Sequence, residues 1–192
     1  SYFSNSDLAA RGKPQGEELA ALEPFRGQVP DPVFGEAYTP PVTDGSGWLR
    51  GNLRRANALL QDAGWVVKDL RLVNAATGEP FRFEILLVSP AFERIALPYV
   101  RNLKRLGIEA KVRLVDENQY INRFRQFDFD MMVWVWGQSE TPGNEQYEYW
   151  SQAAADSQGS RNLAGVRDPV VDKLIELMLR SESREQLNQR TR

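Results

Sequence analysis

The sequence predicts an α/β fold with a central mixed sheet, a βαβαβ core and flanking helices. Between residues 81 and 136, short apolar runs typical of strands alternate with segments whose apolar residues recur every three or four positions. Strands that are joined through helices run parallel, with right-handed crossovers. The 192 residues, 42% of them hydrophobic and 26% charged, have the composition of one ordinary globular domain.

Residues 1–46 predict a mostly extended segment, because many prolines interrupt them. Each proline fixes its own φ and biases the preceding residue away from the helical region. We expect one short helix, at Glu17 to Glu23. An irregular segment of this length is uncommon inside a compact domain, so we expect a strap that lies across a larger neighbour. The prolines are Pro14, Pro24, Pro30, Pro32, Pro40 and Pro41.

The next segment predicts a helix followed by a strand. Ser46 is a candidate N-cap, and Gly64 is a candidate C′ residue that ends the helix. Trp65 to Val73 predicts a strand, and Ala75 to Pro80 predicts a turn. The apolar positions that share one face of the helix are Leu53, Ala56, Leu60 and Ala63.

Two strands joined by a helix are predicted between residues 81 and 115. Phe81 to Val88 and Glu109 to Val115 have the apolar and β-branched character of strands. The helix runs from Pro90 to Leu106 and ends at Gly107. Because Pro98 lies inside it, we expect a kink or the loss of the first turn.

The third strand of the predicted core follows another helix. Asp116 and Gln119 form a capping-box pattern that opens a helix near residues 117–126. From Asp130 to Trp136 the chain then runs through six apolar residues without a polar break. Such a run is typical of a central parallel strand that is buried on both faces.

Two more helices are predicted near the C-terminus. Asp168 is a candidate N-cap with Pro169 at the first helical position, and Ser183 with Gln186 forms a second capping-box pattern. The sequence opens without Met and stops inside this last helical pattern, so we expect both ends to lie within a longer protein. It contains no signal peptide and no apolar run of the length that a membrane span requires.

The composition narrows the possible functions. The 24 Lys and Arg nearly balance the 26 Asp and Glu, and a net charge of −2 disfavours a nucleic-acid partner. The absence of His and Cys removes the commonest general base, thiol nucleophiles and most transition-metal ligands. Asp128 and Asp130 flank a strand end, but a Ca²⁺ site needs six to eight oxygens. The sequence also lacks dinucleotide, P-loop and GxSxG motifs. We therefore predict no cofactor and no metal.

The stretch WGQSETPGNEQYEYW, residues 136–150, is the best candidate for a ligand site. It leaves the carboxyl end of the predicted central strand, where open α/β sheets bind their ligands. Its aromatic, amide and carboxylate side chains suit a small molecule held by stacking and a few hydrogen bonds. The alternative is that Trp134 and Trp136 belong to the core and the loop is only solvated. The candidate binding residues are Trp136, Gly137, Gln138, Ser139, Glu140, Asn144, Glu145, Gln146 and, further along, Asn162.

Two other function classes remain open at this point. Glu140, Glu145 and Glu148 supply carboxylates for a hydrolase, but such a site requires that two of them converge in a cleft. A stand-alone βαβ regulatory module would instead have a complete sheet without a large exposed apolar face.

Four motifs in this order resemble family 5 of the extracellular solute-binding proteins, which includes oligopeptide-, dipeptide- and nickel-binding members. They are NLRRANALLQDAGW at 52–65, NLKRLGIEAKVRLVDENQY at 102–120, FDFDMMVWVWGQ at 127–138 and GSRNLAGVRDPVVDKLI at 159–175. The opening SYFSNSDLAARGKPQGEELAALEPFR and the GQSETPGNEQ loop are similar to the YejA-like branch. Together the four motifs cover most of residues 48–180.

The resemblance implies a non-enzymatic, periplasmic or extracellular, membrane-associated and monomeric component of an ABC transporter. It would bind a peptide or peptide-like ligand between two lobes and deliver it to a membrane permease. Residues 1–46 would be the strap between lobes, residues 47–182 the second, periplasmic-binding-protein-like lobe, and residues 183–192 the start of a helix returning to the missing N-terminal lobe.

The resemblance also raises a question about the ligand's amino group. In the peptide-binding branches an Asp shortly after the strand-ending Trp pairs with the amino terminus of the peptide, and the matching position here is Ser139. Because Ser carries no charge, either a neighbour holds the amine, with Glu140 and Glu145 as the candidate anchors, or the ligand presents no free amine there. Trp136 would form an apolar wall, and Asn144, Gln146 and Asn162 would supply adaptable polar contacts.

Overall fold

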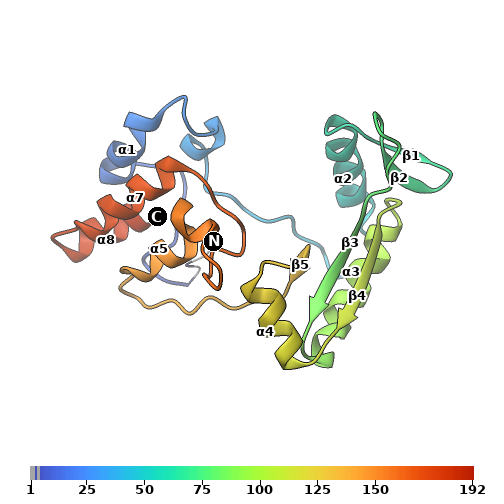
Figure 1. The fold of residues 1–192 in the computed structure, drawn as a ribbon. Coiled ribbons are helices and arrows are strands. Elements are labelled where there is room, and N and C mark those ends of the chain that lie inside the picture. Colours follow the sequence, from blue (N-terminus) through green and yellow to red (C-terminus); the bar gives the residue numbers. More distant parts are fainter. Residues whose placement is uncertain (1–2, 4) are drawn as a thin grey trace. The chain divides into compact units, whose positions relative to one another are not determined.

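The chain folds into two compact units (Figure 1). The computed structural model describes residue 3 and residues 5–192. The first unit combines residues 1–40 with residues 136–192, and the second unit comprises residues 41–135. These boundaries differ from those of the predicted strap (1–46), lobe (47–182) and final helix (183–192). The two compact units do not test how the whole protein divides into lobes, so the strap, lobe and final helix remain predictions.

The second unit contains the predicted βαβαβ core. Its three-stranded parallel sheet has the order β4-β3-β5, and β3 lies in the centre. Helix α3 connects β3 to β4, and helix α4 connects β4 to β5. The elements are β3 (Arg82–Leu87), a 3₁₀ turn η3 (Pro90–Phe92), α3 (Glu93–Lys104), β4 (Glu109–Leu114), α4 (Glu117–Arg125) and β5 (Met131–Met132).

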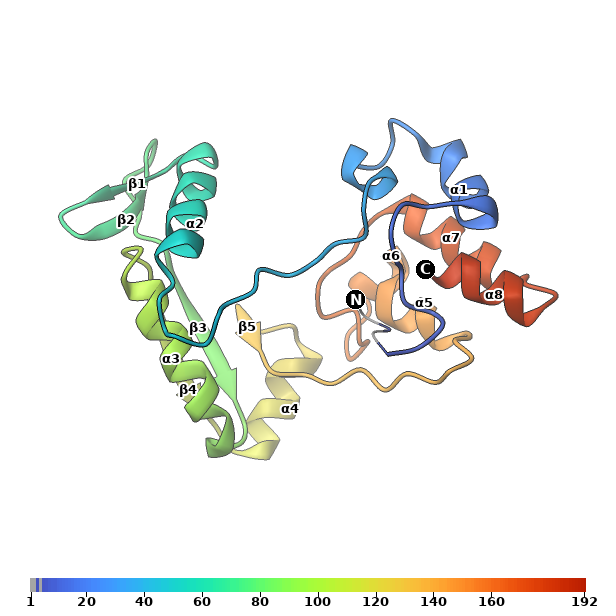
Figure 2. The same ribbon diagram turned by 180° about the vertical axis from the view of Figure 1, so that it is seen from behind.

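The core of this unit forms between β3 and α3, which runs along the sheet (Figure 2). Ile85 and Leu87 of β3 pack with Ala96 of α3, and Leu86 between them is also fully buried. Removing apolar area from water contributes about 25 cal/mol per Å², so these side chains hold the helix on the sheet. Helix α3 continues through Pro98, and only its 3₁₀ first turn is set apart.

The prediction of a central strand at 130–136 is wrong. Only Met131 and Met132 form a strand, and they pair with β3 alone, at the edge of the sheet. The Tyr120 hydroxyl donates a hydrogen bond to the Val133 carbonyl, so a side chain takes the place of a second strand there. Trp134 is half-buried and stacks on the buried Phe124 with ring centroids 4.4 Å apart, so it packs against α4.

The predicted strand at 65–73 is instead a two-stranded antiparallel hairpin of β1 (Trp65–Lys68) and β2 (Arg71–Asn74). Its two turn residues, Asp69 and Leu70, have φ values of 49° and 64°. Two left-handed residues in a row give the turn whose twist suits a hairpin, but Leu is not a residue that predicts it. The parallel and antiparallel strands thus belong to two separate sheets.

Gly107 lies where the hairpin meets the parallel sheet. The Leu72 amide donates to the Gly107 carbonyl over 2.8 Å. A Cβ atom on Gly107, whose φ is 82°, would lie 2.6 Å from that amide nitrogen. Only glycine therefore allows the turn after α3 to contact the start of β2.

Helix α2 (Arg50–Asp62) begins later than predicted. Its N-cap position is Leu49, which makes no side-chain cap, whereas Ser46 lies in a preceding turn. There its backbone amide donates to the Asp44 carboxylate over 2.9 Å. The Asp44 side chain thus holds Ser46 in a local turn. Such side-chain bonds to nearby backbone compete with helix capping.

The named regular elements of the first unit, over its described residues, are helices joined by long loops, and α1 packs against α8. The Asp168 and Ser183 side chains accept hydrogen bonds from the Val170 and Gln186 amides, which confirms both predicted N-caps. The elements are α1 (Gly16–Leu22), η1 (Glu23–Phe25), η2 (Asp31–Phe34), α5 (Glu145–Trp150), α6 (Gln152–Ala155), α7 (Pro169–Leu179) and α8 (Arg184–Thr191).

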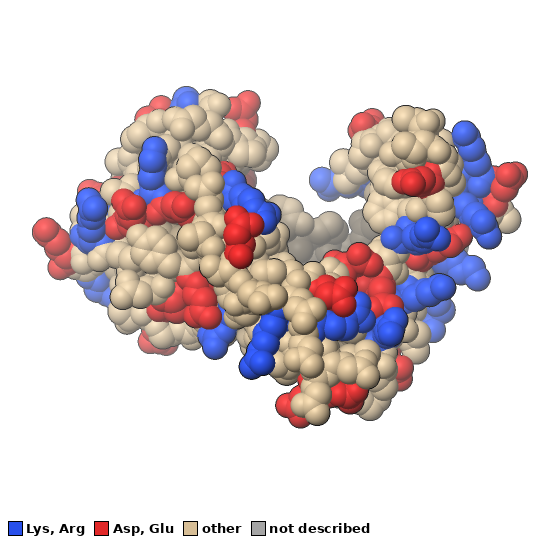
Figure 3. All heavy atoms as spheres, viewed as in Figure 1, with Lys and Arg blue, Asp and Glu red and all other residues tan. Residues whose placement is uncertain are grey.

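Acidic and basic side chains intermingle on the face of each unit that Figure 3 shows. This surface agrees with the near balance of the two charges in the sequence. No helix in the described part of the chain combines the length and the apolar character that crossing a membrane requires.

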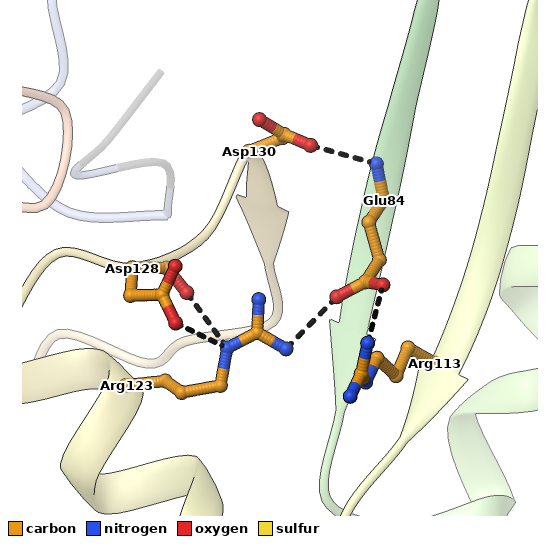
Figure 4. Close-up of polar contacts among 5 residues, drawn as sticks. All are labelled: Glu84, Arg113, Arg123, Asp128 and Asp130. Atoms are coloured by element: carbon orange, nitrogen blue, oxygen red, sulfur yellow. Dashed lines mark hydrogen bonds and ion pairs between the residues drawn. The ribbon is translucent and has the colours of Figure 1, made fainter.

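A cluster of charged groups joins α4 to the sheet of the second unit (Figure 4). The Arg123 guanidinium donates to Glu84 of β3 over 2.9 Å and to the Asp128 carboxylate over 3.0 Å. The Asp130 carboxylate accepts from the Glu84 amide over 2.9 Å, next to β5. Arg113 of β4 reaches Glu84 at 3.4 Å. The cluster therefore fixes the segment that leads into β5.

Replacing Arg123 by Ala should destabilise the second unit by about 1.5–3 kcal/mol, because charged hydrogen bonds to Glu84 and Asp128 are lost together. The Arg123 side chain is only 22% exposed, whereas that of Arg113 is 58% exposed. Arg113→Ala is therefore the matched control, with an expected loss below about 1 kcal/mol. Urea unfolding followed by circular dichroism measures both, and equal effects would contradict this role of Arg123.

Candidate functional site

The candidate site in the first unit is built around two stacked indoles. Trp136 and Trp150 lie with ring centroids 5.6 Å apart and planes inclined by 29°. The Trp136 indole nitrogen donates to the Arg161 carbonyl over 3.0 Å, which fixes the ring. Sequence reasoning did not select Trp150. Trp150 lies four residues after Gln146 in α5, a spacing that places both side chains on one face of the helix and could have predicted their contact.

Gln146 is the centre of a network of side-chain amides. Although it is buried, its amide nitrogen donates to the Gln138 side chain over 2.8 Å and to Glu145 over 3.1 Å. Its oxygen accepts from the Trp150 indole nitrogen over 3.1 Å. The structure thus brings three candidate residues, Gln138, Glu145 and Gln146, together beside the indole pair.

Glu145 holds the turn that precedes α5. Its carboxylate accepts hydrogen bonds from the Gly143 amide at 2.8 Å and from Gln146. Burial by itself would raise the pKa of the Glu145 carboxyl, but these hydrogen bonds outweigh it and leave the pKa below its ordinary value. Glu145 is therefore a carboxylate at neutral pH.

The remaining loop residues lie at the periphery of the network. Ser139 makes a local turn, since its hydroxyl donates to the Thr141 carbonyl over 2.6 Å. The carbonyl of Gly137 accepts from the Tyr149 hydroxyl over 3.0 Å. Glu140 and Asn144 are exposed, and Asn144 precedes α5 without capping it through its side chain.

Asn162 lies apart from this network and serves the fold. It is 1% exposed, and its amide nitrogen donates to the Ser151 and Val166 carbonyls, each over 2.9 Å. Its oxygen accepts from the Val166 amide over 2.9 Å. Both polar groups of the Asn162 side chain are thus bonded to backbone groups, so Asn162 fixes the loop before α7.

A cavity of about 750 Å³ adjoins the network, and Gln146 and Trp150 line part of its wall. Its other lining residues come from the N-terminal segment, α1, α7 and α8, so it lies within the first unit. Cavities of about 300–1,000 Å³ are typical of small-molecule sites. The sequence did not predict it, because four separate segments enclose it.

Among the residues that the structure describes, no group of three or more acidic side chains is placed to hold a metal ion. Asp128 and Asp130 both accept hydrogen bonds within the Arg123 cluster. Their carboxylates therefore stabilise the sheet.

The family model of the bacterial extracellular solute-binding proteins, family 5 Middle, matches residues 21–158. The chain belongs to this family. It lies in the YejA-like branch, since it is 46% identical to the "Probable peptide-binding protein YejA" of Agrobacterium fabrum, over 97% of this chain and 30% of that protein. The "Uncharacterized protein y4wM" of Sinorhizobium fredii is 52% identical, over 97% of this chain and 28% of that protein. The chain thus spans about three tenths of the length of these relatives.

The fold is also that of solved binding proteins. The oligopeptide-binding protein AppA from Bacillus subtilis, in complex with a nonapeptide, superposes with a TM-score of 0.63 at 21% identity. The match covers 91% of this chain and 36% of AppA. It confirms the predicted periplasmic-binding-protein-like fold.

Asn162→Ala should destabilise the first unit by about 2–4 kcal/mol, because one buried and two part-buried backbone groups lose their hydrogen bonds. Asn144→Ala, at an exposed position of the same residue type, should change stability by less than about 0.5 kcal/mol. Urea unfolding of the two variants compares them directly. A small effect at Asn162 would contradict its structural role.

Glu145 should also make the first unit sensitive to acid. Since its pKa is lower in the folded than in the unfolded chain, its contribution is complete above the unfolded pKa and is lost as pH falls through the folded pKa. Glu145→Gln should reduce the loss of stability between about pH 5 and about pH 3. Thermal unfolding across this range, with exposed Glu140→Gln as the control, measures the difference. An unchanged slope in Glu145→Gln would contradict the lowered pKa.

Proposed function

We propose that the protein containing this chain is the extracytoplasmic solute-binding component of an ABC transporter. It binds an oligopeptide or a peptide-like ligand between two lobes and delivers it to a membrane permease. The observation that carries this proposal is the amide and indole network of Gln138, Gln146 and Trp150, which borders a ligand-sized cavity in a chain of this family.

The chemistry of the network suits a peptide. A peptide backbone alternates donors and acceptors, and side-chain amides such as those of Gln138 and Gln146 supply both. The indoles of Trp136 and Trp150 offer apolar surface for side chains. One relative is described as a probable peptide-binding protein, and AppA was solved with a bound nonapeptide, which supports the same ligand class.

The placement of the carboxylates supports binding without chemical conversion. Glu145 is engaged by the Gly143 amide, and Glu148 forms an exposed pair with Arg161 at 3.7 Å. Glu140 stands exposed in the loop. Glu145 and Glu148 are thus engaged by other groups and Glu140 is exposed, an arrangement that does not favour a hydrolase pair converging in a cleft. The much greater length of the relatives likewise disfavours a stand-alone regulatory module.

The mechanism that we propose is closure of two lobes on the ligand by a hinge motion, followed by docking of the closed form on the permease. The present chain would supply the second lobe and the segment between lobes, and the remaining seven tenths of the protein would include the N-terminal lobe. The protein would act as a monomer in the periplasm or, membrane-associated, outside the cell.

This proposal predicts a large difference in affinity between the chain and the whole protein. If two lobes share the contacts, the 192-residue chain should bind a peptide about 1,000-fold more weakly, since losing half of a micromolar binding energy leaves about millimolar affinity. Isothermal titration calorimetry with one peptide and both proteins tests this. Equal affinities would contradict the two-lobe mechanism, and a whole protein that binds no peptide in a diverse library would contradict the ligand class.

A further inference from the structure

The charges of the chain are divided unequally between its two units. The second unit, residues 41–135, contains 14 Lys and Arg and 11 Asp and Glu, whereas the first unit contains 10 and 15. The net charge of −2 for the whole chain thus combines a basic second unit with an acidic first unit. Because opposite charges attract over the surface of a protein, the second unit is suited to an anionic partner.

Helix α3 presents a basic stripe to solvent. Its buried residues, Ala96 and Leu103, lie seven positions apart and face the interior of the unit, so the opposite side of the helix faces outward. Arg94, Arg101 and Arg105 lie on that outer side at spacings of seven and four residues, and all three are exposed. Among the described residues, no ion pair or hydrogen bond engages their guanidinium groups. The fold therefore does not use these three charges.

Exposed apolar side chains accompany the basic stripe. Phe92, Ile95 and Tyr99 follow one another at spacings of three and four residues, and each is exposed although it is large and hydrophobic. On a helix that covers a sheet, the outer positions are normally polar or charged. Basic residues beside exposed aromatic and aliphatic residues on one helix are typical of helices that lie on the surface of an anionic membrane.

A further apolar side chain is exposed at the tip of the β1-β2 hairpin. Leu70 is 91% exposed and has a φ of 64°, a conformation for which Asn or Gly is better suited. The fold thus gives no reason for a leucine at this position. The tip lies beside the end of α3, because a Cβ on Gly107 would lie 3.2 Å from the Leu70 carbonyl oxygen. The hairpin tip and α3 therefore expose apolar groups next to each other.

We propose that the outer side of α3 and the tip of the hairpin form a contact surface for an anionic phospholipid membrane. The guanidinium groups of α3 bind lipid phosphates, for which their planar donor geometry is suited. The exposed apolar side chains of α3 and Leu70 enter the boundary between headgroups and acyl chains. This inference goes beyond the proposed function, since it concerns neither the transported ligand nor its site.

A lipid surface fits these side chains better than one small anion or an acidic protein. Arg94 and Arg105 are separated by about 16 Å along the helix axis, a length that spans several lipid headgroups. A protein partner would need a cavity for each exposed apolar side chain, whereas fluid acyl chains and headgroups rearrange around them. Each Lys or Arg held near an anionic leaflet strengthens binding about fivefold.

The test measures co-sedimentation of the full-length protein with phosphatidylcholine vesicles that contain or lack phosphatidylglycerol. Wild-type protein should bind the phosphatidylglycerol vesicles about tenfold or more tightly, and added salt should weaken this binding. The triple variant Arg94→Gln, Arg101→Gln, Arg105→Gln should lose most of the preference, because it removes the charges that face the lipid.

A second triple variant is the matched control. Arg82→Gln, Lys111→Gln and Arg125→Gln remove the same net charge from exposed positions. Arg82 and Lys111 alternate along their strands with Phe83 and Val112, which pack on the α3 side, and Arg125 belongs to α4. These three residues therefore lie away from α3, and their replacement should change vesicle binding by less than about twofold.

Leu70→Asn separates membrane contact from folding. Asn suits the positive φ of the hairpin tip, so thermal unfolding should show unchanged or higher stability. Binding to phosphatidylglycerol vesicles should nevertheless weaken by about fivefold or more, because the apolar side chain no longer enters the lipid. Circular dichroism establishes that every variant is folded.

The possible outcomes are distinct. Equal binding to both kinds of vesicle, or equal losses in the two triple variants, would overturn the inference, since the second result reflects net charge alone. Wild-type protein that ignores phosphatidylglycerol vesicles but binds an acidic protein through α3 would overturn it as well. Each of these results leaves peptide binding, which calorimetry measures separately, and thus the proposed function unaffected.

Discussion

The ion pair between Arg123 and Glu84 is the interaction on which the architecture of the second unit depends. It links the last turn of α4 to the central strand β3, and Asp128 receives the other edge of the same guanidinium. Phe127, with φ 55°, ends α4 in a left-handed conformation that directs the Asp128 amide back to the Arg123 carbonyl over 2.9 Å. One side chain thus sets both the end of the helix and the start of the segment that becomes β5.

This constraint explains why the sheet has its observed order. Strand β5 is only two residues long and gains little from its own ladder. It is held because Asp130 bonds the Glu84 amide before the strand and Tyr120 bonds the Val133 carbonyl after it. Side chains of α4 and of the turn after it therefore hold β5 in place, as the backbone hydrogen bonds of a longer strand would.

Local sequence patterns predicted the fold where the decisive contacts are local. The caps at Asp116, Asp168 and Ser183 involve residues two or three positions apart, and the structure confirms them. The hairpin at Asp69 and Leu70 escaped prediction because Leu rarely adopts a positive φ. The run at 130–136 was misjudged because hydrophobic character indicates burial but not which strand lies beside it. In the site, Gln138 contacts Gln146 within the same loop region, and Asn162 bonds Ser151 and Val166 nearby in the sequence, but no local pattern marks these side-chain contacts. The cavity is lined by segments far apart in the sequence.

The open edge beyond β5 has a consequence for anyone who prepares this chain alone. Val133 to Val135 have no strand beside them among the described residues, and Val135 is 81% exposed. Although Tyr120 bonds the Val133 carbonyl, an exposed hydrophobic segment beside a short edge strand is a template on which a second molecule can add a strand. Concentrated solutions of the isolated chain are therefore expected to self-associate through this segment, and a lysine at position 135 would be the conservative means of keeping them monodisperse.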